Sequence, residues 1–343
     1  MLGLGVGSAN TVTSKTMFNK LKNYLRKHLI IEPYLSGMAV IFTLHRVAPF
    51  EAGKLPSNEH MRISPEFLEQ FVNELMKQGY SFINLDRLHE ILISGERVSK
   101  QVVFTLDDGY KDNFEIAYPI FKKLNIPFTI YVTTSFPNKE ALLWWYLLED
   151  LILANDEITL YQNDKYRCHS FEERNDLFLK IRRVILSLEQ CDLSNELKRM
   201  FSHYDIDWIA KCNELAMSWD DIISLSKDSL ATIGGHTKNH YALNKLCKSD
   251  IIKEVEGANK LIESKIGKAV SHFAYPFGTR HEVGITEFDV IKELGLKTTT
   301  TTRRGPIYKE HVNYLECLPR IMLTENFDMR SIAEIRKKRV VTL

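Results

Sequence analysis

The chain has 343 residues, 44% of them hydrophobic and 26% charged, a composition typical of a soluble globular enzyme with a sizeable core. A formal net charge of +1 gives no reason to expect nucleic acid as a partner. No apolar run approaches the roughly 20 residues that a membrane-spanning helix requires.

The five cysteines are scattered, odd in number and form no paired motif, which argues against a disulfide framework and a cysteine-based metal site. Basic residues interrupt every apolar stretch near the N-terminus, so the pattern is not that of a signal peptide. We therefore expect a cytoplasmic protein. It would be peripheral to the inner membrane if the basic segment near its N-terminus, described next, binds lipid.

That basic segment lies within residues 1–36, which we interpret as an amphipathic N-terminal extension. Residues 15–30 carry apolar side chains at helical spacing, with lysines mostly on the other faces. Such a helix either docks on the following domain or lies on an anionic membrane surface.

The remaining chain, 37–343, alternates short apolar runs with longer amphipathic ones. Eight runs are typical of strands: 38–44, 81–85, 102–106, 126–134, 231–235, 271–276, 296–302 and 315–323. Helical patterns lie between them; one at 65–78 has Ser64 as N-cap and Pro65 at its first position. This alternation predicts an α/β fold, a distorted (β/α) TIM-like barrel.

Residues 137–215 interrupt the alternation, and we interpret them as a mainly helical insertion. The segment contains adjacent aromatic residues, Trp144 and Trp145. Their ring faces either border a sugar site or pack the insertion onto the barrel.

Polar side chains occur where the predicted strands end. His45 follows 38–44, Asp107 and Asp108 follow 102–106, and His236 follows 231–235. The carboxyl ends of barrel strands converge on one face, so we expect these residues to meet there.

His236 and His240 are four residues apart, so both imidazoles point the same way on a helical turn. Two imidazoles and one carboxylate make the open three-ligand site of a catalytic zinc. A divalent cation would also allow adjacent Asp107 and Asp108 to stay ionised. The alternative interpretation is an Asp-Asp-Gly turn that caps the next segment.

Three motifs, "TLDDG" (105–109), "HTKNH" (236–240) and "FAYPFG" (273–278), resemble in order the first three motifs of the polysaccharide deacetylase family, the NodB-homology or carbohydrate esterase 4 group. The resemblance runs from about His45 to Arg320. The stretch "LHRV" (44–47) is similar to one in the exopolysaccharide and poly-N-acetylglucosamine deacetylase subgroup.

The resemblance implies a role for each matching residue of the first two motifs. Asp107 corresponds to the catalytic base. Asp108, His236 and His240 correspond to the metal ligands. Zinc is the expected cofactor, although the same ligands serve cobalt, nickel and iron.

The third motif and the "LHRV" stretch supply the other implied roles. The backbone N–H of Phe277 corresponds to the oxyanion donor, and Tyr275 and Pro276 are expected to border the substrate. His45 corresponds to the general acid.

One departure concerns the catalytic base. The family's third motif often begins with an arginine that holds the base, and here that position is Ala274. Arg320, within the last predicted strand, is the candidate substitute; its other interpretation is a structural ion pair.

The resemblance implies a metal-dependent hydrolase that removes N-acetyl groups from hexosamine units of a glycan and releases acetate. An N-acetylated glycan is then its partner, and the sequence does not set the oligomeric state. Three alternatives stay open: an amidase that acts on a non-sugar amide, a non-catalytic carbohydrate-binding protein, and a membrane-attached scaffold.

Overall fold

The structure, a computed structural model, describes residues 37–161 and 164–328. The basic segment 15–30, for which we expect an amphipathic helix, lies outside these residues. Among the described residues, no helix has the length and apolar character needed to cross a membrane.

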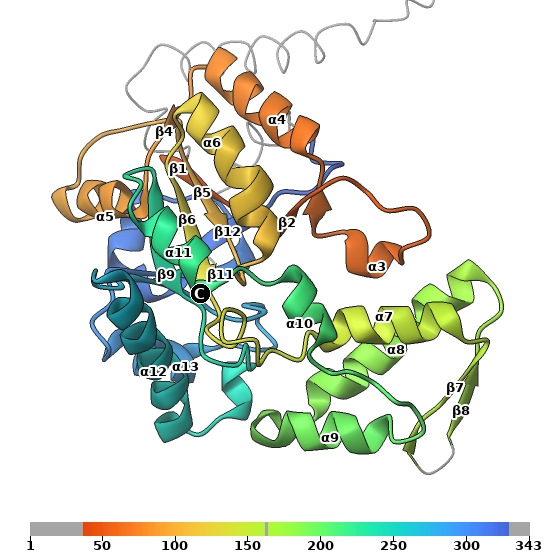
Figure 1. Cartoon of the computed structure of the whole chain (residues 1–343). Helices are drawn as coiled ribbons and strands as arrows, with labels where there is room; N and C mark the ends of the chain where they lie inside the picture. The colour runs from red at the N-terminus through yellow and green to blue at the C-terminus, as the bar shows by residue number, and fades with distance from the viewer. Residues whose placement is uncertain (1–36, 162–163, 329–343) are drawn as a thin grey trace, which may run out of the picture.

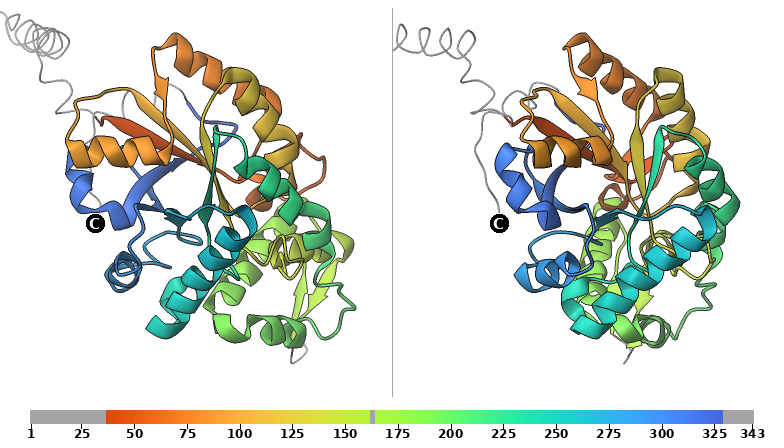
Figure 2. Two further views of the ribbon diagram at one scale, coloured as in Figure 1. Left: turned by 60° about the vertical axis from the view of Figure 1, so that its left-hand side comes forward. Right: turned by 90° about the vertical axis from the view of Figure 1, so that its left-hand side faces the viewer.

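Seven parallel strands close into a barrel surrounded by helices (Figures 1 and 2). The strand β5 pairs with β1 in register from Ala39–Gln101 to Leu44–Leu106, which closes the ring. The predicted distorted (β/α) barrel is therefore confirmed. In order around the ring, the strands are β1 (Ala39–Leu44), β12 (Leu318–Met322), β11 (Thr298–Arg304), β10 (His272–Ala274), β9 (Ala231–Gly235), β6 (Phe128–Val132) and β5 (Gln101–Leu106).

One of the eight predicted strands, at 81–85, is not part of the ring. Only β4 (Ser81–Phe82) is extended, and it pairs with the first two residues of β5, ahead of the point where β6 joins. Asn84 ends this strand because its side chain accepts a hydrogen bond from the Arg87 N–H and so caps the next helix.

The helices that surround the barrel follow the strands in chain order. They are α4 (Pro65–Lys77), α5 (Leu85–Ser94), α6 (Tyr118–Leu124), α11 (Trp219–Ser226), α12 (Lys248–Ile266) and α13 (Ile285–Lys292). Ser64 caps α4 as predicted, with its side chain accepting from the Phe67 N–H. Pro119 lies in α6 two residues after a π-helical turn (Asn113–Ala117) that continues directly into the helix. A widened turn of this kind accommodates the missing N–H of proline.

The segment between β6 and β9 forms a separate group of helices on one side of the barrel (Figure 1). Its own buried cluster includes Ile152, Phe178 and Ile181. Its elements are α7 (Trp144–Ala154), an antiparallel pair β7 (Glu157–Thr159) and β8 (Lys165–Arg167), α8 (Phe171–Ser187), α9 (Leu193–Met200) and α10 (Ala210–Leu215).

A second, shorter excursion follows β1. The strands β2 (Arg46–Val47) and β3 (Arg62–Ile63) pair in parallel, and α3 (Pro56–Glu59) lies between them in the chain. Helix α3 faces α7 and α8 (Figure 1). Short 3₁₀ turns complete the described elements, at Gln190–Asp192, Leu243–Lys245, Lys309–Asn313 and Leu315–Cys317.

The barrel interior changes from apolar to polar along the strands. Successive strand residues point to opposite faces, so Ile41 and Thr43 share the inner face of β1 while Phe42 packs outward against α4. On β5, Val103 lies in the same buried cluster as Ile41, and Thr105 follows on the same face. The polar end of the interior is therefore the carboxyl end of the strands.

Candidate active site

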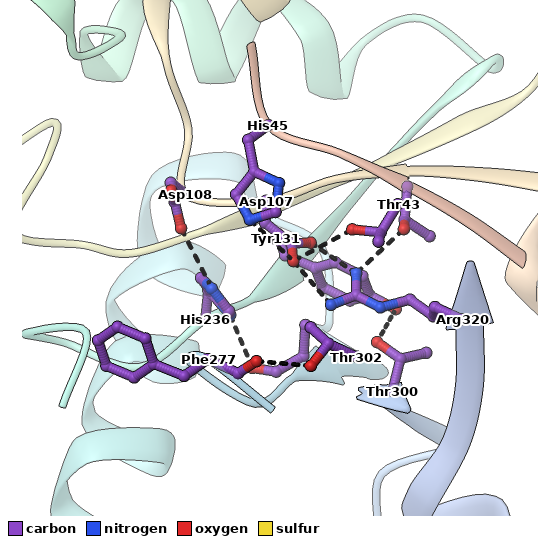
Figure 3. A network of polar contacts seen from close by, with 12 residues as sticks. Thr43, His45, Asp107, Asp108, Tyr131, His236, Phe277, Thr300, Thr302 and Arg320 are labelled. Carbon is purple, nitrogen blue, oxygen red and sulfur yellow. Dashed lines mark hydrogen bonds and ion pairs between the residues drawn. The ribbon is translucent and has the colours of Figure 1, made fainter. Parts of the chain in front are cut away.

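The strand-end residues meet because they continue the inward alternation of their strands. His45 follows Thr43 on β1, and Asp107 follows Thr105 on β5. On β9, Gly234 faces the ring of Tyr131, and His236 is the next inward position. Figure 3 shows these side chains converging on one corner of the barrel mouth.

The Asp107–Asp108 pair is separated by a sharp turn of the backbone. Asp108 has a φ of 79° and Gly109 a φ of 98°, so both residues are in the left-handed region. Only glycine enters this region without strain, and strained non-glycine residues cluster at functional sites. The turn aims the two carboxylates at different partners, which a simple capping turn does not require.

Asp108, His236 and His240 form a cluster that fits a divalent metal ion. One ligand atom from each lies within 4.8 Å of the others. The Oδ1 atom of Asp108 is 3.2 Å from Nε2 of His236 and 3.3 Å from Nε2 of His240. This oxygen is buried and accepts no hydrogen bond among the described residues, so a cation would supply its missing partner.

The tautomer of His236 also suits a ligand. Its Nδ1 lies 2.7 Å from the carbonyl oxygen of Ala274, which can only accept, so Nδ1 carries the proton and Nε2 presents its lone pair. Burial raises the pKa of Asp108, but the adjacent imidazoles of His240 and His236 lower it well below its usual value. The carboxylate is therefore ionised, as a ligand must be.

The loop between the two histidines is held by hydrogen bonds from outside the site. The N–H of His240 donates to Oγ1 of Thr237 at 2.9 Å. The carboxylate of Glu254 on α12 accepts from the N–H groups of Lys238 at 3.1 Å and Asn239 at 2.9 Å. These contacts fix the direction of the His240 side chain.

Asp107 is held by Arg320, which lies on β12 with no exposed surface. The guanidinium Nη1 donates to Oδ1 of Asp107 and Nη2 to Oδ2, each at 2.7 Å (Figure 3). Burial raises the pKa of Asp107, but the charge of Arg320 and its hydrogen bonds lower it below its usual value. The carboxylate therefore stays ionised and its orientation is fixed.

Arg320 is itself fixed by the barrel wall. Its Nε donates to the carbonyl oxygen of Thr301 at 2.9 Å, and Nη1 donates to Oγ1 of Thr105 at 3.1 Å. The register between β11 and β12 shifts between Thr300 and Arg304, and such irregularities re-aim side chains near functional sites.

Ala274 lies on the inner face of β10, in the same buried cluster as Tyr131. The Arg320 guanidinium lies over the Tyr131 ring, 5.6 Å from its centre. The cation that holds Asp107 thus comes from β12, two strands away from the position of the family's arginine.

His45 lies beside Asp107, with Nε2 of the imidazole 3.9 Å from Oδ2 of the carboxylate. Its Nδ1 is buried without a hydrogen-bond partner among the described residues. Burial lowers the pKa of His45, although the charges of Asp108 and Asp107 oppose this effect. The imidazole is therefore neutral near pH 7 in the free protein.

Phe277 lies at the mouth of the barrel with a φ of 60°. Its carbonyl oxygen accepts from Oγ1 of Thr302 at 2.7 Å, whereas its N–H donates to no group in the described part of the chain. Gly278 completes the turn: a Cβ there would lie 2.8 Å from the Thr302 nitrogen, so only glycine fits.

The expectation that Tyr275 borders the substrate is wrong. Alternation along β10 turns this side chain outward, where it packs against Phe273 and Phe288 and donates to the Glu316 carbonyl oxygen at 2.8 Å. Pro276 is buried behind the turn and does not line the cavity described next.

A cavity of about 240 Å³ opens over Asp107 and the metal cluster, and Trp144 and Trp145 line it. Trp144 is 5% exposed and packs mainly into the core of its own helical group. The Trp145 ring lies 5.8 Å from the His240 ring, and its Nε1 is buried without a partner among the described residues. A second cavity of about 170 Å³ adjoins and shares both tryptophans.

Sequence reasoning missed several residues that support the site. Thr43 donates to Oδ2 of Asp107 at 3.3 Å, and Thr105 binds Arg320. Both threonines lie two residues before His45 and Asp107, on the same strand face. The two-residue period of the strands could therefore have predicted them. Arg182, which also lines the cavity, has no signal in the sequence because only the folding of α8 against α3 brings it there.

The comparisons with known proteins concern the fold and the family of this chain. A curated relative, YxkH of Bacillus subtilis (strain 168), is 29% identical over 79 residues, which are 23% of this chain and 28% of YxkH. Two solved structures share the fold: the Streptococcus pyogenes deacetylase PplD (TM-score 0.59, 15% identity, 88% of this chain and 100% of that chain) and IcaB from Ammonifex degensii (TM-score 0.55, 16% identity, 89% and 99%).

The family model described as polysaccharide deacetylase matches residues 94–299, more than half of the chain. That range contains the Asp107–Asp108 turn, both histidines of the metal cluster and the Phe277 turn. The predicted family is therefore confirmed, and this chain belongs to the polysaccharide deacetylases.

Proposed function

We propose that the chain is a metal-dependent N-deacetylase that removes acetyl groups from hexosamine units of a polysaccharide or glycan intermediate. The observation that carries the proposal is the pairing of a three-ligand metal cluster with an ionised carboxylate, Asp107, held by Arg320 in the same cavity. Hydrolysis of an amide needs such a base beside an electrophilic centre.

Asp108, His236 and His240 would hold the metal ion. Two imidazole nitrogens and one carboxylate oxygen suit zinc, cobalt, nickel or iron, and we propose zinc because three protein ligands leave its fourth position open. A bound divalent cation would supply Lewis-acid activation of the acetyl carbonyl and of the attacking water.

Asp107 would accept the proton from the attacking water. Its carboxylate is suited to this role because Arg320 keeps it ionised and leaves it no freedom to rotate. Positioning of this kind is one of the larger contributions to catalysis. The adjacent Asp108 would bind the cation, and this division of labour explains why the chain has two neighbouring aspartates.

Two further groups would act on the acetamide. The free N–H of Phe277 would donate to the developing oxyanion, a contribution of about 3 to 4 kcal/mol for a well-placed donor. His45 would donate a proton to the departing amine. Because burial lowers the pKa of His45, its proton would come from Asp107, 3.9 Å away, after Asp107 has deprotonated the water.

The cavity supports a sugar as the substrate. Trp145 lines the cavity beside the metal cluster, with its ring 5.8 Å from the His240 ring, so an aromatic surface is available for a sugar to pack against. The adjoining second cavity offers room for a neighbouring sugar unit. The Streptococcus pyogenes deacetylase was solved in complex with acetate, the product that we propose for this chain.

The test is acetate release from N-acetylglucosamine oligomers by the zinc-loaded protein. We expect turnover by the wild type, a loss of about 10²- to 10⁴-fold in kcat with normal zinc content for Asp107→Asn, and loss of zinc for Asp108→Asn. Zinc is measured by elemental analysis. Near-normal activity in both variants would show that the assignment is wrong.

The same assay separates the alternatives. Hydrolysis of cyclic amides in place of sugar amides would indicate an amidase with another substrate. Binding of the oligomers without acetate release, with or without zinc, would indicate a carbohydrate-binding protein.

A further inference from the structure

Arg182 is a cation in the cavity wall that the deacetylation chemistry does not use. It lies on α8, outside the barrel, and lines the same cavity as Asp107 and the metal cluster. In the described part of the chain, its guanidinium makes no hydrogen bond or ion pair.

Its position is fixed by the packing of α8. Ile181 and Ile185 hold the helix in its own buried core, while the Oδ1 of Asn175 accepts from the Ser57 N–H of α3 at 3.0 Å. Asn175 and Arg182 are seven residues apart, which is two helical turns, so both lie on the face directed at α3. The guanidinium therefore reaches the cavity from a rigid element.

The acids of the cavity do not neutralise Arg182. Among the described residues, the acidic side chains that line it are Asp107 and Asp108. Asp107 is already paired with Arg320, and Asp108 lies between the two imidazoles of the metal cluster. Each of these carboxylates thus has its own partner.

One acid outside the cavity wall influences Arg182 without pairing with it. Burial lowers the pKa of Arg182, and the charge of Glu282 opposes this effect only in part. The Glu282 carboxylate accepts a hydrogen bond from the Thr279 hydroxyl and makes no ion pair with Arg182. Partial removal of a guanidinium from water is unfavourable unless an anion takes the place of the water.

A planar guanidinium presents paired N–H donors that match a carboxylate or a phosphate. The neighbouring His60, which also lines the cavity, adds no negative charge; its Nδ1 lies 2.8 Å from the Ser57 carbonyl oxygen. This wall of the cavity is therefore suited to an anionic ligand group, at a distance from the acetyl group that the metal cluster would receive.

We propose that Arg182 binds a carboxylate or phosphate group carried by the glycan, so that the substrate of this chain is an acidic rather than a neutral glycan. The inference rests on the proposed deacetylase function and adds the substrate class. Arg182 acts here on binding and specificity, and Asp107 acts on the chemistry.

The test compares three probes with the zinc-loaded protein: a neutral N-acetylglucosamine tetramer, a tetramer alternating N-acetylglucosamine with glucuronic acid, and an N-acetylglucosamine tetramer with a terminal phosphate. We expect kcat/KM to favour at least one acidic probe over the neutral one by about 10- to 100-fold, the range of a charge-assisted hydrogen bond. Which of the two acidic probes is preferred shows whether Arg182 binds a carboxylate or a phosphate group.

The decisive variant is Arg182→Gln, in which this preference should fall to about one. Arg182→Lys should retain part of it, because the charge remains but the paired donors are lost. The matched control is Arg183→Gln, which removes the same charge from the exposed neighbouring position and should keep the wild-type preference. If Arg182→Gln lowered kcat/KM equally for all three probes, or changed it for none of them, the proposal would be overturned.

A binding measurement separates this inference from the proposed function. If the wild type hydrolyses none of the probes, the proposed N-acetylhexosamine activity fails. Calorimetry with the Asp107→Asn protein then still decides the role of Arg182. Tighter binding of an acidic probe that disappears in the Asp107→Asn, Arg182→Gln double variant supports it, and equal binding of all probes contradicts it.

Discussion

Asp107 and Arg320 form a completely buried pair, and their environment determines what the carboxylate can do. A buried carboxylate without a partner would take up a proton and lose its ability to act as a base. Two parallel hydrogen bonds of 2.7 Å from a fixed guanidinium prevent this. The pair therefore keeps the Asp107 carboxylate ionised and oriented, as its proposed role as a base requires.

Removal of Arg320 should move the pH dependence of the reaction in a defined direction. In Arg320→Gln, burial is no longer opposed by the guanidinium, so the pKa of Asp107 rises. Because Asp107 accepts a proton only when ionised, the acidic limb of the kcat/KM profile should move to higher pH. Arg320→Lys, which keeps the charge without the paired geometry, should give an intermediate shift.

Loss of one partner from a buried ion pair also costs about 3–5 kcal/mol of stability. The pH profiles are therefore measured at a temperature below the thermal unfolding midpoint of each variant, which is determined by circular dichroism. An acidic limb that stays at the wild-type pH in a folded Arg320→Gln protein would contradict the role of Arg320.

At the scale of elements, the cavity depends on contacts between α7 and the segment that contains α3. Glu149 of α7 is completely buried, and its carboxylate accepts from the Leu55 N–H at 2.5 Å and from Nδ2 of Asn58 at 2.8 Å. Arg46 adds a second link, because it donates to the Tyr146 hydroxyl at 2.9 Å and pairs with Asp112. These contacts hold the cavity wall that carries Trp145.

Glu149→Ala should destabilise the protein by about 1–3 kcal/mol for each buried donor that it leaves unpaired. The matched control is Asp150→Ala at the next position, where the carboxylate is 41% exposed and pairs with Lys54 and Lys211, so its loss should cost at most about 1 kcal/mol. Urea denaturation measures both. Similar costs for the two variants would show that Glu149 does not anchor α3.

At the scale of the whole molecule, the proposed metal ligands come from segments that are far apart in the chain. Asp108 follows β5, whereas His236 and His240 follow β9, and β6 lies between these strands. A cation that binds all three ligands cannot bind them in the unfolded chain, so its binding energy adds to the stability of the fold.

Removal of the metal should therefore lower the melting temperature as well as the activity. At a zinc concentration 100 times the dissociation constant, binding adds about 2.7 kcal/mol to the free energy of unfolding. Differential scanning calorimetry with zinc and with a chelator measures the difference. The Asp108→Asn protein should show no such difference, and a wild-type melting temperature that is indifferent to zinc would contradict the metal site.

Several features of the molecule could be predicted from the sequence because they depend on neighbouring residues. Strand alternation and capping residues are local, and they predicted the barrel and the start of α4 correctly. The length of the strand at 81–85 was overestimated, since Asn84 caps a helix where the apolar pattern continues. Tyr275 was misplaced because its motif was interpreted without the alternation that turns its side chain outward.

The sequence by itself determined the family, the barrel and the residues that gather at the strand ends, because these follow from short motifs and from the two-residue period of strands. Only the tertiary structure decided that Arg320 pairs with Asp107, where Ala274 offers no arginine, because this contact joins residues 213 positions apart in the chain. The tertiary structure likewise brought Arg182 into the cavity, since contacts between residues more than a hundred positions apart in the chain leave no local pattern.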